Sequence, residues 1–234
     1  MSFVSQSTKK KYSIAMDGPV GAGKSTLARM CAKALGFIYI DTGALYRAIG
    51  LYCYKNNIQV ESESCVINSL DNIKIALEKG DGQQRVILNG EDVSDDIRLP
   101  EVSMKASAVS AIPKVREFLL DMQRDFAKTE NVIMDGRDIG TVVLPNADLK
   151  IFITTKAEIR AKRRYDELIQ KGINTTFEEV LADLNTRDYN DSHRKVAPLK
   201  QAEDAYLIDT GNMDLQQSFE FTLSFIKEKL GLNV

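Results

Sequence analysis

A glycine-rich segment that ends in lysine and serine carries the clearest chemical signal in the sequence. It runs from Gly18 to Ser25 (GPVGAGKS) and fits the pattern G-x-x-x-x-G-K-[ST]. An apolar run ends at Asp17 and a helical pattern begins near Lys24, so the segment joins a strand to a helix. Glycines in such a turn let successive backbone N–H groups face phosphate oxygens, and the helix N-terminus adds a positive end. We therefore expect a nucleoside triphosphate to bind here.

The same pattern predicts a magnesium ion beside the phosphates. Lys24 offers a positive charge to the outer phosphates, and Ser25 offers a hydroxyl ligand to Mg²⁺. Asp135 ends a later apolar run (VIMD) and could hold the ion through water. A simpler interpretation of Asp135 is an aspartate at a strand end that caps the next turn. The sequence contains no N-K-x-D motif, which disfavours a GTPase.

Arginines follow or precede several of the expected strands. Arg47, next to Tyr46, comes soon after one apolar run, Arg137 follows another, and Arg187 and Arg194 stand before the last. Ligands of open α/β sheets bind at the carboxyl ends of the strands. A guanidinium group holds phosphate oxygens in a planar fork. One arginine alone is more often a surface residue, but several at one edge predict a second, phosphate-bearing substrate.

These residues need a scaffold of short buried strands separated by helices. We expect strands at Ser13–Asp17, Phe37–Asp41, Val132–Asp135, Lys150–Thr154 and Ala205–Asp209. Helical patterns lie at Thr26–Leu35, Ala44–Asn56, Val102–Thr129 with an interruption at Pro113, Lys156–Lys171, Phe177–Tyr189 and Leu215–Leu230. Continuously apolar strands that alternate with helices predict a parallel sheet with helices on both faces.

One stretch, Glu61–Pro100, departs from this alternation. Within it, Asn89 and Gly90 separate the strand-like pieces Arg85–Leu88 and Glu91–Val93. Asn-Gly between two such pieces is a strong signal for a β-hairpin. We therefore predict a small antiparallel insertion in the parallel sheet protein.

Composition excludes several classes of protein. The 234 residues include 31 Lys and Arg against 33 Asp and Glu, for a net charge of −2, which disfavours a protein that binds polymeric nucleic acid. Three cysteines without a C-x-x-C pair fit neither a disulfide framework nor a zinc site, and they favour a reducing compartment. The sequence has no apolar stretch of about 20 residues that could span a membrane. We expect a cytoplasmic protein with no membrane partner.

The sequence resembles the bacterial cytidylate kinases over nearly its whole length, from about Tyr12 onward. The segments that carry the resemblance are GPVGAGKST (Gly18–Thr26), DTGALYR (Asp41–Arg47), GEDVSDDIR (Gly90–Arg98), DGRDIGTVVLPNADLKIF (Asp135–Phe152), RDYNDSHRKVAPL (Arg187–Leu199) and LIDT (Leu207–Thr210). The resemblance implies a P-loop NTPase fold with three α/β/α layers, a five-stranded parallel sheet, a small antiparallel β insertion and a helical lid. It also implies transfer of the γ-phosphoryl group of ATP to CMP or dCMP, with Mg²⁺, by a monomeric enzyme.

The resemblance also implies an organisation of the chain. A leader at residues 1–11 precedes a single kinase domain at residues 12–234. Its core comprises residues 12–60, 101–155 and 195–234, the monophosphate-binding insertion lies at about 61–100, and the lid lies at about 156–194.

The resemblance assigns roles to individual residues. The expected ATP-binding residues are Gly18, Pro19, Val20, Gly21, Ala22, Gly23, Lys24, Ser25, Thr26 and Arg163. The expected CMP-binding residues are Thr42, Tyr46, Arg47, Ser107, Arg116, Arg137, Asp138, Asp191 and Arg194. The expected catalytic residues are Lys24, Arg137, Arg187 and Arg194, and the expected metal-site residues are Ser25 and Asp135.

The chemistry of cytosine can be checked against the three residues expected to read it. An aspartate such as Asp138 accepts a hydrogen bond from the C4 amino group, whereas Arg116 and Ser107 suit the N3 and O2 acceptors. Uracil would leave the carboxylate facing lone pairs, so we expect CMP to be preferred over UMP. From spacing alone, Ser107 and Arg116 could equally be solvent-facing residues of a helix.

Two alternatives to cytidylate transfer remain at this stage. One is a kinase for another small acceptor such as UMP or AMP. The other is a regulatory module that binds ATP as a switch without transfer, although a switch has no need of an acceptor pocket. We do not expect His193, the single histidine, to act as a base, because phosphoryl transfer depends mainly on positioning and charge neutralisation.

Overall fold

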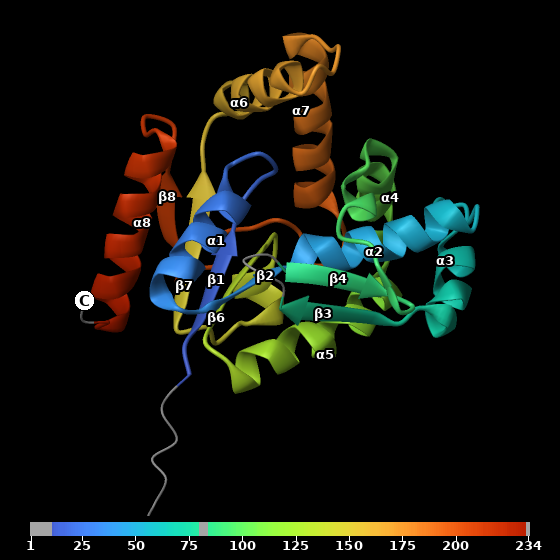
Figure 1. Cartoon of the computed structure of the whole chain (residues 1–234), viewed down its shortest axis with the longest axis horizontal. Helices are drawn as coiled ribbons and strands as arrows, with labels where there is room; N and C mark the ends of the chain where they lie inside the picture. Colours follow the sequence, from blue (N-terminus) through green and yellow to red (C-terminus); the bar gives the residue numbers. More distant parts are fainter. Residues whose placement is uncertain (1–10, 80–83, 233–234) are drawn as a thin grey trace, which may run out of the picture.

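A five-stranded parallel sheet forms the centre of the protein (Figure 1). The computed structural model describes residues 11–79 and 84–232. The strand order is β2-β6-β1-β7-β8, and the five strands are β1 (Ser13–Asp17), β2 (Ile38–Asp41), β6 (Val132–Gly136), β7 (Leu149–Thr154) and β8 (Tyr206–Asp209). The prediction of five parallel strands is confirmed. The expected leader at residues 1–11 lies outside the described residues except for Lys11.

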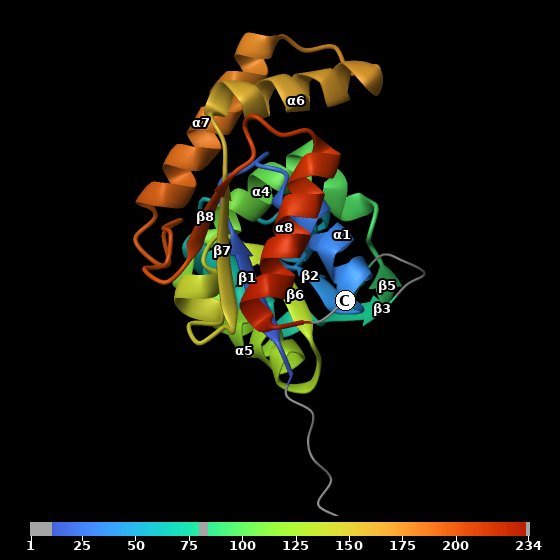
Figure 2. The ribbon, with the colours of Figure 1, turned by 90° about the vertical axis from the view of Figure 1, so that its left-hand side faces the viewer.

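Side chains of the central strands point alternately to the two faces of the sheet. On β1, Ile14 and Met16 pack toward α1 (Lys24–Leu35) and α8 (Leu215–Leu230), whereas Ala15 packs on the opposite face. There it meets a group of apolar residues that α5 (Pro113–Thr129) helps to cover. Helices therefore cover both faces: α1 and α8 lie together on one face (Figure 2), and α5 packs on the other, so the three-layer prediction is confirmed.

A smaller antiparallel sheet lies beside the main sheet and contains β3 (Ile75–Lys79), β4 (Gln84–Leu88) and β5 (Glu91–Asp92). The expected hairpin joins β4 to β5, and both of its turn residues have positive φ, +51° at Asn89 and +92° at Gly90. Strand β3 was not predicted, because its residues IALEK show no clear alternation of polar and apolar side chains. The short helix α3 (Glu63–Ser69) and the 3₁₀ turns η1 (Leu70–Asn72) and η2 (Asp96–Arg98) complete this part of the chain.

The helical pattern at Val102–Thr129 forms two helices, α4 (Pro100–Ser110) and α5. Pro113 begins α5, where its missing N–H is not needed, so the expected interruption is confirmed. Helix α4 packs closely on α2 (Thr42–Lys55), because a side chain at Gly50 would lie 2.9 Å from the backbone nitrogen of Ala106. This close packing places Val102 and Ala106 of α4 against Gly50 of α2.

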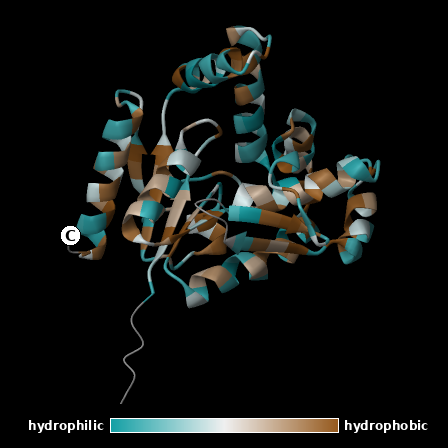
Figure 3. Ribbon diagram, in the orientation of Figure 1, coloured by the Kyte–Doolittle hydropathy of each residue, from teal (hydrophilic) through white to brown (hydrophobic). Residues whose placement is uncertain are grey.

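Two polar helices cross beyond the carboxyl ends of the strands. They are α6 (Ala157–Gln170) and α7 (Phe177–His193), which lie above the sheet in Figure 1 and are mostly hydrophilic in Figure 3. A capping box formed by Thr176 and Glu179 begins α7. The helix continues to His193, four residues beyond the expected end at Tyr189, so the segment RDYNDSH is helical. No helix in the described part of the chain is long and apolar enough to cross a membrane.

Candidate active site

One cavity at the carboxyl edge of the parallel sheet gathers most of the predicted site residues. Its volume is about 270 Å³. It is lined by residues from the glycine-rich loop, α2, α4, α5, the end of β6 and α7, namely Val20, Gly21, Lys24, Ser25, Asp41, Thr42, Gly43, Tyr46, Arg47, Ser103, Ala106, Ser107, Ser110, Arg116, Asp135, Gly136, Arg137, Asp138, Arg187, Asp191 and Arg194. Segments far apart in the sequence therefore meet at the carboxyl edge of the sheet, as expected from the sequence.

The glycine-rich loop has a backbone that only glycine fits at its first position. Gly18 has φ +149°, and a Cβ there would lie 2.0 Å from the carbonyl oxygen of Ile153. Gly23 precedes α1 with φ +84°, and Lys24 begins the helix. The Lys24 Nζ donates a hydrogen bond to the carbonyl oxygen of Pro19 at 3.0 Å. Burial, followed by the charge of Arg137, lowers the pKa of Lys24 to about 7.

Asp135 connects the loop to the second strand. Its carboxylate accepts hydrogen bonds from the Ser25 hydroxyl at 2.6 Å and the Tyr39 hydroxyl at 3.0 Å. Its carbonyl accepts one from the Thr42 hydroxyl at 2.8 Å. Burial and the nearby Asp41 raise the pKa of Asp135. Its contacts are made across the site to other elements, so the interpretation of Asp135 as a simple cap of the next turn is wrong.

Arg47, the first arginine of the cavity, forms an ion pair with Asp41. Asp41 caps α2 by accepting the Ala44 N–H, and its other oxygen accepts from the Arg47 guanidinium at 2.6 Å. Burial would raise the pKa of Asp41, but Arg47 holds it below its ordinary value. The Arg47 Nε is buried without a hydrogen-bond partner among the described residues. Arg47 therefore keeps an unused donor beside the cavity.

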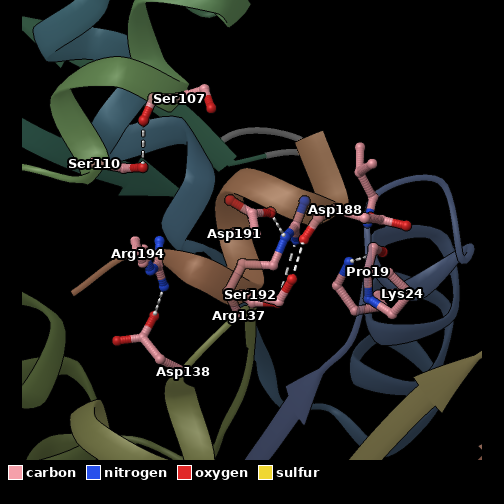
Figure 4. A network of polar contacts seen from close by, with 12 residues as sticks. Pro19, Lys24, Ser107, Ser110, Arg137, Asp138, Asp188, Asp191, Ser192 and Arg194 are labelled. Atoms are coloured by element: carbon pink, nitrogen blue, oxygen red, sulfur yellow. Dashed lines mark hydrogen bonds and ion pairs between the residues drawn. The ribbon is translucent and has the colours of Figure 1, made fainter. Parts of the chain in front are cut away.

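A second arginine pairs with helix α7. The Arg137 Nε donates to the Asp191 carboxylate at 2.6 Å, and its Nη1 donates to the Gly136 carbonyl at 3.3 Å. Figure 4 shows this pair between the end of β6 and α7, with Lys24 beyond it. Arg137 is thus held between α7 and the glycine-rich loop.

The third group surrounds Asp138, whose carboxylate pairs with two arginines. One oxygen accepts from Arg116 and the other from Arg194, the latter at 3.3 Å (Figure 4). Arg116 also donates to the Ser110 carbonyl at 3.1 Å and lies over the Tyr46 ring, 5.4 Å from its centroid. Arg116 is buried, so a solvent-facing role for it is wrong.

Ser107 lies on α4 near this pair and lines the same cavity. Figure 4 shows Ser107 one turn from Ser110, whose hydroxyl donates to the Ser107 carbonyl at 2.8 Å. The Ser107 side chain is half-buried. Ser107 therefore lies at the cavity and is not a fully solvent-facing residue of the helix.

Two predicted arginines occupy different surroundings. Arg187 lines the cavity from α7 and donates to Asp183 at 3.1 Å. Arg163 lies on α6 away from this cavity and donates to the carbonyl oxygens of Thr210 at 2.8 Å and Met213 at 3.3 Å. Five other residues predicted to bind ATP do not line the cavity either, namely Gly18, Pro19, Ala22, Gly23 and Thr26.

Comparisons with known proteins agree with this geometry. A family model described as cytidylate kinase matches residues 14–228. The chain belongs to the cytidylate kinase family. A cytidylate kinase of Caldicellulosiruptor bescii is 51% identical over 214 residues, which cover 92% of this chain and 95% of that protein. The cytidylate kinase of Caldicellulosiruptor saccharolyticus is 49% identical over 225 residues, which cover 96% of this chain and all of that one.

A solved structure supports the fold alone. A protein of Eubacterium ventriosum, described as uncharacterized, matches with a TM-score of 0.50 at 13% identity. The match covers 94% of this chain and 99% of that one. At this level of identity, the two proteins share an architecture and nothing more is inferred.

Sequence reasoning missed two groups that shape the site of this cytidylate kinase family member. Buried Asp17 accepts the backbone N–H groups of Ile139 at 2.8 Å and Gly140 at 2.7 Å, so it holds the π-helical turn Ile139–Val143 that follows Asp138. Burial raises the pKa of Asp17 to about 6. The sequence feature that could have identified Asp17 is its position at the end of an apolar strand, directly before the glycine-rich loop. The second group is the ion pair of Arg160 and Asp188. The sequence did not single out Arg160, because it stands among several other basic residues on α6.

Proposed function

We propose that this protein is a cytidylate kinase that transfers the γ-phosphoryl group of ATP to CMP or dCMP, giving ADP and CDP or dCDP. The observation that carries the proposal is the arrangement of the cavity. A phosphate-binding loop lies at one end, a buried carboxylate with two arginines lies at the other, and Arg137 lies between them. A kinase for an anionic nucleotide needs these three features within reach of one another.

ATP occupies the loop end in this proposal. The backbone N–H groups of Gly18–Thr26 hold its phosphates, and the positive end of α1 adds to the attraction. Lys24 exchanges its bond to the Pro19 carbonyl for phosphate oxygens. Arg163 lies near the loop after β8, where it would border the adenine base.

The residues beside Lys24 fit a magnesium ion. Ser25 and Asp135 form a hydroxyl and carboxylate pair in contact at 2.6 Å, the oxygen donor types that Mg²⁺ takes in P-loop proteins. Burial and the nearby Asp41 raise the pKa of Asp135, and a cation bound beside it would favour its charged form. Ser25 and Asp135 would hold the ion, which would neutralise charge on the outer phosphates. No group of three His, Cys, Asp or Glu side chains suited to a metal occurs among the described residues.

CMP occupies the other end. Arg47 and Arg137 bind its phosphate, and the free Nε of Arg47 offers a donor for it. Thr42 and Tyr46 border the nucleotide from α2, and Asp191 accepts from the sugar hydroxyls. Arg194 lies over the acceptor from the end of α7.

Asp138 and Arg116 distinguish cytosine from uracil in this proposal. Asp138 accepts from the C4 amino group, while Arg116 and Ser107 donate to N3 and O2. Both Asp138 and Arg116 are buried, with 6% and 8% of their side chains exposed. A buried carboxylate facing the uracil carbonyl would cost about 1–3 kcal/mol, so CMP is preferred over UMP.

Transfer is direct and in line. A phosphate oxygen of CMP attacks the γ-phosphorus of ATP, a new P–O bond forms, and the bond to the β-phosphate oxygen breaks with its electrons on ADP. Lys24, Arg137, Arg187 and Arg194 stabilise charge on the transferring group. The helices α6 and α7 cover the site and exclude water that would otherwise hydrolyse ATP.

The test is a product assay. The protein is incubated with ATP, Mg²⁺ and CMP, and nucleotides are separated by chromatography. We expect CDP and ADP in equal amounts, and little ADP when CMP is left out. ATP binding without a diphosphate product from CMP, dCMP, UMP or AMP would refute kinase activity and indicate a nucleotide switch instead.

A further inference from the structure

Arg160 makes contacts that reach from the lid to the glycine-rich loop. It lies in the first turn of α6, and its side chain is 6% exposed. Its Nε donates to the carbonyl of Thr155, just after β7, and its Nη1 donates to the carbonyl of Val20 at 2.8 Å. Its Nη2 pairs with the Asp188 carboxylate on α7 at 2.6 Å. One guanidinium therefore joins the end of β7, the glycine-rich loop and α7.

Asp188 completes a clamp on a single residue of the loop. Its second carboxylate oxygen accepts the backbone N–H of Val20 at 3.3 Å. The N–H and the carbonyl of Val20 are thus both bound by one ion pair, and Figure 4 shows Asp188 pointing toward the loop. A backbone bound at both groups cannot turn without breaking a charge-assisted hydrogen bond.

Apolar contacts support the clamp. The Val20 side chain packs against a small group of lid residues formed by Ala161, Val180 and Leu184. A Cβ at Gly21 would lie 3.5 Å from atoms of Arg160 and of Leu184, so the lid is already in van der Waals reach of the loop. The loop that holds the ATP phosphates is therefore one wall of the lid interface.

Neither Arg160 nor Asp188 lines the cavity, whereas Val20 of the loop does. Arg187 and Asp191 lie on the same helix as Asp188, Arg194 directly follows that helix, and all three line the cavity. Any movement of α7 that releases Asp188 therefore also moves the arginines that meet the transferring phosphate. The ion pair acts on the chemistry through other residues.

We propose that Arg160 and Asp188 are positioning residues that make closure of the lid and the shape of the ATP-binding loop a single event. This proposal rests on the proposed function. With the pair formed, Val20 is fixed, α7 is docked, and the γ-phosphate faces Arg137 and the acceptor. With the pair broken, ATP still binds to the loop, but the lid closes poorly and water reaches the γ-phosphate.

The test compares four variants with the wild-type protein. Arg160→Met keeps the length of the side chain and removes its charge and donors, and Arg160→Lys keeps only a point charge. Asp188→Asn keeps an acceptor for the Val20 N–H. Arg164→Met is the matched control, because Arg164 is half-exposed on the same helix and pairs with Glu167 of that helix.

For Arg160→Met we expect kcat to fall by about 10²-fold, with the KM for CMP within about twofold, since misplacement of groups by about 1 Å costs this much. Arg160→Lys should recover part of the loss, and Asp188→Asn should lose about tenfold. Because the two residues act as one unit, the Arg160→Met/Asp188→Asn double variant should be no slower than Arg160→Met.

A second readout separates positioning from simple destabilisation. In Arg160→Met and Asp188→Asn, the ratio of ATP hydrolysis to CMP phosphorylation should rise by about tenfold, because an open lid admits water. Melting temperatures are measured for every variant, and Asp188→Asn carries the test where Arg160→Met does not fold. Unchanged kcat and hydrolysis ratio in a folded variant, or losses that multiply in the double variant, would overturn the proposal.

Failure of the proposed function gives a different result. In that case the wild-type protein itself would phosphorylate no acceptor. Binding of a fluorescent ATP analogue and its accessibility to a quencher would then be measured in the same proteins. Greater quenching in Arg160→Met than in wild type and Arg164→Met would support the clamp, and equal quenching would refute it.

Discussion

In the proposed function, the two ends of the cavity bind phosphate in different ways. At the donor end, eight consecutive residues from Gly18 to Ser25 supply backbone groups, and the single lysine bonds to a carbonyl of its own loop. At the acceptor end, arginines come from four separate elements, and each is paired with a carboxylate before any substrate arrives. The donor end is local in sequence, whereas the acceptor end exists only in the folded chain.

This difference has a physical reason. A polyphosphate chain is recognised by repeated N–H groups, which any residue type provides once the backbone curls. An acceptor nucleotide presents one phosphate, a sugar and a base, so its pocket needs particular side chains in fixed directions. The carboxylates Asp41, Asp138 and Asp191 hold the guanidinium groups in place and reduce the cost of ordering long side chains when the substrate binds.

The largest expected effect is at the junction of the two ends. Replacing Lys24 or Arg137 by Met removes a charge that faces the transferring phosphoryl group, and we expect kcat to fall by about 10³-fold or more. Steady-state kinetics with ATP and CMP measure the loss, and circular dichroism checks the fold. Lys33→Met is the control, since Lys33 is exposed on the same helix as Lys24. Turnover near the wild-type rate in both variants would contradict the assigned roles.

A variant of Arg47 tests whether the acceptor end binds CMP independently of ATP binding at the donor end. Arg47→Met removes a charged donor of the CMP phosphate, worth about 1.5–3 kcal/mol. The KM for CMP should rise by about 10- to 100-fold, while the KM for ATP changes little because Arg47 is paired with Asp41 at the other end of the cavity. Equal increases in both KM values would mean that the two ends are not separable in this way.

Asp138 tests base recognition. Asp138→Asn presents a donor as well as an acceptor to the base, so the preference for CMP over UMP should fall by about tenfold. The variant also removes the counter-charge of Arg116 and Arg194, so its melting temperature is measured beside its kinetics. An unchanged CMP-to-UMP ratio in a folded variant would show that another residue reads the base.

The smallest expected effect is a pH dependence at the donor end. The pKa of Lys24 in the free protein is about 7, and bound phosphate favours the charged form and raises it. ATP binding above pH 7 is then linked to proton uptake, so affinity falls as pH rises. Lys24 is about half charged at pH 7 and about one-tenth charged at pH 8, which predicts roughly fivefold weaker binding at pH 8.

Calorimetry measures this linkage directly. ATP is titrated in two buffers of different ionisation enthalpy at pH 8, and the difference in observed heat gives the protons taken up. Uptake approaching one proton is expected. Release of protons, or no exchange at all, would mean that Lys24 is already charged before ATP binds.

The comparison of the two ends also explains what the sequence could predict. The loop and the five strands were predictable because their signals are local: a fixed pattern of glycines, and apolar runs that end in polar residues. The strand β3 was missed because its residues lack alternation and are ordered by pairing with β4. The full length of α7 was missed because its last turn is polar and lies against other parts of the site.

Pairings among charged residues could not be predicted in the same way. Asp188 and Asp191 lie three residues apart on α7, yet one pairs with Arg160 beside the loop and the other with Arg137 beside the acceptor. Spacing along a helix shows that they share a face, but not which arginine each will meet. That choice depends on where α6 and β6 place their side chains, which is a property of the whole fold.

The most direct test of the account is the specificity of the wild-type protein for its acceptor. kcat/KM is measured with saturating ATP and Mg²⁺ for CMP and for UMP under identical conditions. The account predicts that CMP exceeds UMP by about tenfold or more, because only cytosine satisfies the buried Asp138 carboxylate. Equal values for the two nucleotides would contradict it.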